Sequence, residues 1–166
     1  GTSAGGSRSG SIEVAAIADT RGERARQAVA IAQRPPESAG DAQSAQAMSA
    51  LIEAGRTAIV PDSSMVVTHD LIDVVIDATG KPAVGAEIGL KAMEHGKHLV
   101  MMNVEADVTI GAYLKHAASK LGVVYSLGAG DEPSSCMELI EFVSAMGHRV
   151  VAAGKGKNNP LNHDAT

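Results

Sequence analysis

Hydrophobic residues occur along this chain in short blocks that alternate with longer amphipathic stretches. The clearest block, IDVVIDAT over residues 72–79, is apolar or small at six of its eight positions and stops at Gly80. Such a block is typical of a strand that is buried on both faces of a parallel sheet. A helical pattern begins directly afterwards at Pro82, where the missing N–H of proline costs nothing. The segment therefore predicts half of a β-α-β unit.

The same alternation extends over most of the sequence. Strands are expected over residues 12–19, 57–60, 72–79, 99–103, 123–127 and 149–153, and helices over residues 24–33, 41–53, 83–94, 107–120 and 134–146. Residues 34–40, RPPESAG, are expected to form a loop, and Asp41 to cap the helix that follows. Short strands alternating with helices predict an α/β fold with a doubly wound, mostly parallel sheet.

Composition narrows the domain organisation and the class of partner. Residues 1–11 are Gly/Ser-rich and are expected to be a linker or tag, residues 12–154 the α/β domain, and residues 155–166 a polar connection. A net charge of −5 and only three aromatic residues argue against nucleic-acid binding. No long apolar run or signal peptide is visible, so we expect no membrane partner and a cytoplasmic location.

Polar residues gather where the expected strands end. Asp19, Thr20 and Arg21 follow the first strand, residues 78–82 follow the central one, and Asn103 to Glu105 follow the next. A further turn, residues 128–132, has two glycines that allow a close approach of the backbone to a ligand. Because parallel strands end at one edge of a sheet, these groups together predict a nucleotide-type site there.

The residues after the first strand do not distinguish between NAD and NADP as the cofactor. A carboxylate at this position, here Asp19, can bind the adenosine ribose of NAD, whereas Arg21 and Arg24 can accept the 2′-phosphate of NADP. Alternatively, Asp19 simply caps the helix that follows. We expect no metal site, because no ligand spacing is visible, and we expect the isolated His69 to be solvated.

The segments IDVVIDATGKPAVGAEIGLKAMEHGKHLVMMNVEADV (residues 72–108) and GVVYSLGAGDEP (residues 122–133) carry a family resemblance. The chain resembles, from residue 12 to its end, the nucleotide-binding domain of homoserine-dehydrogenase-like NAD(P)-binding oxidoreductases. The similarity is closer to the branch of deoxyxylulose phosphate reductoisomerase-like enzymes of the methylerythritol phosphate pathway. The resemblance implies a Rossmann-like fold and an NADPH-dependent oxidoreductase, with NAD as the alternative cofactor.

The resemblance also implies roles for individual residues. Asp19, Thr20 and Arg21 would face the adenosine ribose, and the segment made of Ala78, Thr79, Gly80, Lys81 and Pro82 would run beside the dinucleotide. The region of Asn103 and Glu105 would lie near the nicotinamide. Homoserine dehydrogenases tend to have Asn-Lys at this strand end, whereas Val104 and Glu105 follow Asn103 here, which disfavours homoserine as the substrate.

Two departures from the family pattern set further expectations. The family opens with a strand and a G-x-G-x-x-G turn, where this sequence has its Gly/Ser segment, and the family's catalytic domain follows at about residue 166. We therefore expect weak or no cofactor binding and no turnover by this chain alone, with the catalytic residues outside it. Unpaired strand edges would favour a homo-oligomer or a strand-swapped assembly. The alternatives are a non-catalytic truncated or engineered α/β scaffold and a regulatory nucleotide-binding module.

Overall fold

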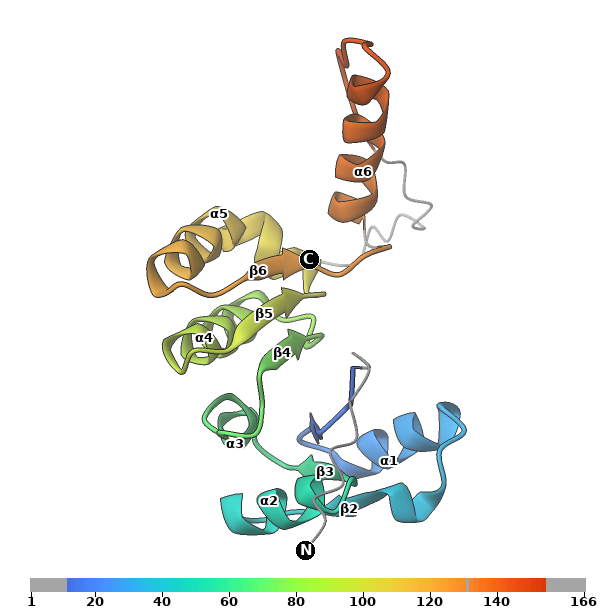
Figure 1. The fold of residues 1–166 in the computed structure, drawn as a ribbon, viewed down its shortest axis with the longest axis vertical. Helices are drawn as coiled ribbons and strands as arrows, with labels where there is room; N and C mark the ends of the chain where they lie inside the picture. The colour runs from blue at the N-terminus through green and yellow to red at the C-terminus, as the bar shows by residue number, and fades with distance from the viewer. Residues whose placement is uncertain (1–11, 131, 155–166) are drawn as a thin grey trace, which may run out of the picture. The chain divides into compact units, whose positions relative to one another are not determined.

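The computed structural model describes residues 12–130 and 132–154 of the chain, which divide into two compact units. The first unit is Gly1–Val75 and the second is Ile76–Thr166. Each unit contains helices and strands that alternate along the sequence, as labelled in Figure 1. The residue ranges 1–11 and 155–166, for which we expected a linker and a connection, lie outside the described part.

The first unit is built on a three-stranded parallel sheet in the order β1-β3-β2. Its elements are β1 (Ala16–Ala18), α1 (Gly22–Ile31), the 3-10 turn η1 (Pro36–Ser38), β2 (Ala39–Asp41), α2 (Ala45–Glu53), β3 (Thr57–Val60) and α3 (Ser63–Val67). The central strand β3 is buried along its whole length, and both α1 and α2 pack against it. An unbroken apolar strand between two neighbours is the pattern that a parallel sheet requires.

Two predictions around residue 41 were wrong. Residues 39 and 40, expected to be loop, and Asp41, expected to cap the next helix, form the edge strand β2. Ser44 caps α2 instead, through a bond of 3.2 Å from the N–H of Ala47. Glycine and alanine carry little strand signal by themselves. Pairing with β3 supplies the backbone hydrogen bonds that the sequence pattern could not show.

The second sheet has the order β4-β5-β6. Its elements are β4 (Val74–Asp77), α4 (Pro82–Glu94), β5 (His98–Met101), α5 (Val104–Leu121), β6 (Tyr125–Leu127) and α6 (Glu132–Ala145). Helices α4 and α5 pack on each other and against the sheet, around the buried side chains of Met93, Leu99 and Leu114. None of the helices in the described ranges is both long and apolar enough to cross a membrane.

The α/β class and the parallel pairing are confirmed, and the described strands pair in two three-stranded groups. Two details of the prediction were wrong. β4 is an edge strand whose alternate residues, Val74 and Ile76, are 46% and 57% exposed, so it is not buried on both faces. Residues 149–153 include the apolar run 150–153, yet none of the described strands pairs with them and they form no strand.

Candidate functional site

The carboxyl end of β4 carries a buried carboxylate. Asp77 is 2% exposed, and its Oδ1 accepts a hydrogen bond of 3.1 Å from the backbone N–H of Thr79. Its Oδ2 accepts a bond of 3.2 Å from the side-chain amide of Asn103, at the end of β5. The two strand ends are also joined by their backbones, since the N–H of Met102 donates to the carbonyl of Asp77 at 2.9 Å.

Asn103 uses its whole amide group within the protein. Besides Asp77, its Nδ2 donates to Thr79 Oγ1 at 3.2 Å and to the carbonyl of Lys81 at 3.0 Å. Its Oδ1 accepts from the N–H of Ala106 at 3.2 Å and so caps α5, which begins at Val104 rather than at Asp107 as the sequence suggested. With 1% exposure and both amide hydrogens occupied, Asn103 positions the loop after β4.

A glycine lets α4 approach this polar cluster. A Cβ atom at Gly85 would lie 2.5 Å from Asp77 Oδ2 and 2.6 Å from Asn103 Nδ2, which are both closer than real Cβ contacts. Gly80 has φ of 67°, a left-handed conformation that favours glycine. Asp77, Asn103 and Gly85 therefore fix the loop of residues 78–82 from its buried side, while its five residues, Ala78 to Pro82, are all exposed.

The ends of β5 and β6 meet beside this loop. The N–H of Gly128 donates to the carbonyl of Met101 at 3.0 Å, and a Cβ atom at Gly128 would lie 2.8 Å from Met102 Cγ. Glu105 is exposed in the first turn of α5. The predicted convergence of the strand ends is thus observed for β4, β5 and β6; Asp131 lies outside the described residues.

In the first unit, the end of β1 forms a tight turn into α1. Asp19 Oδ1 accepts a hydrogen bond of 2.7 Å from the N–H of Arg21, which is itself the N-cap residue of α1. Thr20 and Arg21 are exposed, and no ion pair within the described residues involves Arg21 or Arg24. The other carboxylate oxygen of Asp19, Oδ2, makes no hydrogen bond within the described residues.

An ion pair that the sequence pattern does not predict lies near this turn. Arg26 of α1 bonds through its Nη2 to Asp41 Oδ2 at the end of β2. The two residues are 15 positions apart and belong to different elements, so no sequence pattern connects them. They line a pocket of about 210 Å³ together with Arg34 and apolar residues that include Val29 and Ile59.

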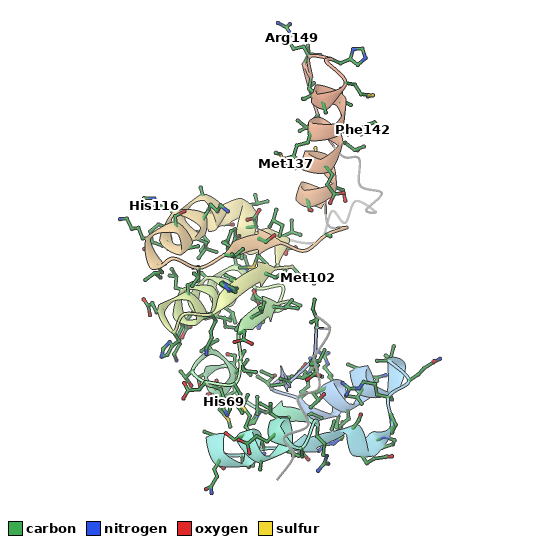
Figure 2. All side chains as sticks on the ribbon, viewed as in Figure 1. His69, Met102, His116, Met137, Phe142 and Arg149 are labelled. Atoms are coloured by element: carbon green, nitrogen blue, oxygen red, sulfur yellow. The ribbon has the colours of Figure 1, made fainter. Side chains whose placement is uncertain are left out.

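The expectation that His69 is solvated was wrong. His69, labelled in Figure 2, is 7% exposed, and its Nδ1 accepts a bond of 3.2 Å from the N–H of Leu71. The ring proton must then lie on Nε2, which donates to Ser49 Oγ at 3.0 Å and to the carbonyl of Ala45 at 3.3 Å. A histidine that donates to a serine cannot act as its base, so this pair is structural.

The polar groups after β1 and those after β4 belong to different units. The sequence predicted that these groups lie at the same edge of one sheet. The observed strand pairing does not test this, because it joins β1 and β4 to different partner strands. Within the described ranges, no group of three His, Cys, Asp or Glu residues could hold a metal ion. What each unit presents is a parallel sheet whose carboxyl end carries exposed polar groups and a glycine-containing turn, the usual location of nucleotide sites in α/β proteins.

These features are typical of a nucleotide-binding α/β fold, and comparison with known families identifies the class as a nicotinamide-dinucleotide-binding domain of an oxidoreductase. Residues 3–127 match the homoserine dehydrogenase NAD-binding domain, and residues 130–166 match the catalytic domain of oxidoreductase DRL. The first match covers most of the sequence, so the chain belongs to the homoserine dehydrogenase NAD-binding domain family. No curated protein matches the chain.

Proposed function

We propose that this chain is the cofactor-binding part of an NADPH-dependent oxidoreductase of the deoxyxylulose phosphate reductoisomerase-like kind. The observation that supports the choice of NADPH is the presence after β1 of two exposed arginines, Arg21 and Arg24, which form no ion pair within residues 12–130 and 132–154. A guanidinium group suits the 2′-phosphate of NADPH because it can donate two parallel hydrogen bonds to phosphate oxygens. Asp19 and Thr20 would bind the ribose beside it.

The family resemblance leads us to expect that the loop after β4 runs beside a bound dinucleotide. Thr79, Gly80 and Lys81 are exposed there, and the bonds from Asn103 hold the loop in one conformation. Pro82 begins α4, whose N-terminal N–H groups favour a negatively charged ligand. Glu105, exposed at the start of α5, would lie towards the nicotinamide.

Homoserine oxidation is the second candidate, because the family of residues 3–127 is named for homoserine dehydrogenase. The match of residues 130–166 to a different catalytic domain, that of oxidoreductase DRL, favours the first candidate. For this chain by itself we propose no turnover and weak cofactor binding, because its sequence contains no G-x-G-x-x-G turn to hold the pyrophosphate.

Calorimetric titration of NADPH and NADH tests this function. We expect a chain extended by a βα unit with a G-x-G-x-x-G turn to bind NADPH with micromolar affinity, on the order of −8 kcal/mol, and NADH more weakly. The present chain should bind both weakly, and Arg21→Ala should remove the preference for NADPH in the extended chain. Lys120→Ala, at the far end of α5, serves as the control. Equal affinity for NADH and NADPH would contradict the proposal, and micromolar binding by the present chain would contradict the need for the added turn.

A further inference from the structure

The ion pair between Arg26 and Asp41 lies close to the turn that follows β1. A Cβ atom at Gly22, the first residue of α1, would lie 3.4 Å from Arg26 Nη1. The guanidinium group of Arg26 therefore extends back along the helix to its first turn, three residues after Asp19. Arg26 is thus a third cation near the proposed ribose site, besides Arg21 and Arg24. Unlike those two, it forms an ion pair within the described residues, with Asp41.

The partner of Arg26 comes from the neighbouring part of the sheet. Asp41 is the last residue of β2 and is in register with Ile59 of β3, so its carboxylate projects at the carboxyl edge. The side chains of Arg26 and Asp41 are 53% and 48% exposed. A half-exposed pair of this kind contributes little to stability and is open to a competing anion. The other arginine of the pocket, Arg34, donates instead to Thr57 Oγ1 at 3.1 Å.

We propose that Asp41 is a specificity-determining residue that lowers the affinity of this site for a 2′-phosphate by holding Arg26. The proposal rests on the proposed function, since it assumes that the adenosine ribose binds after β1. A phosphate in this place must compete with the Asp41 carboxylate for Arg26, and it is also repelled by that carboxylate. Replacing Asp41 by an uncharged residue of the same shape removes both effects.

The experiment uses adenosine 2′,5′-bisphosphate and 5′-AMP as probes, because both need only the adenosine part of the site. Their binding to the present chain is followed by NMR, with the backbone amides of residues 19–26 as reporters of position. We expect Asp41→Asn to increase the affinity for the bisphosphate about three- to tenfold and to leave 5′-AMP within about twofold. Asp73→Asn, an exposed acid of the same unit, is the matched control.

Two further variants test whether the higher affinity of Asp41→Asn for the bisphosphate depends on Arg26. In the double variant Asp41→Asn/Arg26→Ala the gain should disappear. Arg26→Ala alone should change the affinity for the bisphosphate by less than about twofold, because Asp41 already occupies this guanidinium group. This single variant keeps the proposal testable even where Asp41→Asn does not fold.

The outcomes separate this proposal from the function on which it rests. If neither probe shifts the amides of residues 19–26, the adenosine site is elsewhere, and the proposed function and this inference both fail. If both probes bind there but Asp41→Asn leaves the bisphosphate affinity unchanged, only the role of Asp41 is overturned. A large loss of bisphosphate affinity in Arg26→Ala would also overturn it, since Arg26 would then be free to bind phosphate in the wild-type chain.

Discussion

At the scale of single residues, the organisation of the site depends most on Asn103. One side chain, 1% exposed, joins the end of β4, the loop that follows it and the start of α5. An amide suits this position because it presents a donor and an acceptor without charge. It thereby satisfies the carboxylate of Asp77, which is also buried and which water cannot reach to solvate.

Removal of the Asn103 amide should be costly. We expect Asn103→Ala to lower the free energy of unfolding by about 2–4 kcal/mol, because it leaves the buried Asp77 carboxylate without its side-chain donor. Urea unfolding followed by far-UV circular dichroism measures this, as the sequence contains no Trp to report by fluorescence. Glu105→Ala, exposed two residues later, should change the free energy by less than about 0.5 kcal/mol. A similar small change in Asn103→Ala would contradict the role given to Asn103.

At the scale of elements, the contact between α5 and β6 has its own polar link. Tyr125 of β6, 6% exposed, donates its hydroxyl hydrogen to Asp107 Oδ1 of α5 at 2.5 Å. Burial raises the pKa of Tyr125 well above its usual range, and the hydrogen bond to Asp107 and the negative charge of that carboxylate raise it further. Gly111 allows this arrangement, since a Cβ atom there would lie 2.2 Å from Asp107 Oδ1.

The raised pKa of Tyr125 predicts a loss of stability in alkali. Below the ordinary tyrosine pKa of about 10 the phenol is protonated in both states, and its stabilising contribution is complete. Above that pH the unfolded chain releases the proton while the folded chain retains it, so unfolding becomes more favourable as the pH rises.

Chemical unfolding at pH values between about 8 and 11 tests this link, on either side of the ordinary tyrosine pKa. Tyr125→Phe should lower stability at pH 8 by about 1–2 kcal/mol and should reduce the further loss in alkali. Tyr113→Phe, whose side chain is 60% exposed on the same helix as Asp107, should retain the alkaline loss. An identical pH dependence in wild type and Tyr125→Phe would show that the hydrogen bond to Asp107 does not couple folding to proton binding.

At the scale of the whole molecule, open strand edges and exposed apolar side chains predict self-association. β1 pairs only with β3, and β4 only with β5, among the described strands. Exposed apolar residues lie on β4, directly after β5 and directly before β6, namely Val74, Ile76, Met102 and Val124. An unpaired edge with apolar flanks can pair with another copy of the chain.

Light scattering tests this expectation. We expect a mass of at least twice the 16.9 kDa of the chain at working concentration. Ile76→Lys, which places a charge on the exposed face of an edge strand, should shift the population towards the monomer. Lys in place of the exposed Val108 on α5 is the control for added charge. A wild-type mass of 16.9 kDa, that of the monomer, would contradict the expectation of a homo-oligomer or a strand-swapped assembly.

The sequence by itself determined the α/β class, most of the helices and strands, and the polar groups at the strand ends. These depend on local chemistry: the β-branched run before Asp77, the proline that begins α4 and the glycines that follow several helices act over a few residues. The exposed loop of residues 78–82 and the turn from Asp19 to Arg21 could therefore be located without coordinates.

Only the tertiary structure decided which of these groups contact one another. The bonds of Asn103 to Asp77, of Asp41 to Arg26 and of His69 to Ser49 join residues 26, 15 and 20 positions apart. Such contacts depend on the order of the strands in the sheet, which composition and periodicity do not encode. For the same physical reason the division of the strands into two sheets, and the pairing of residues 39–41 as a strand, emerged only from the fold.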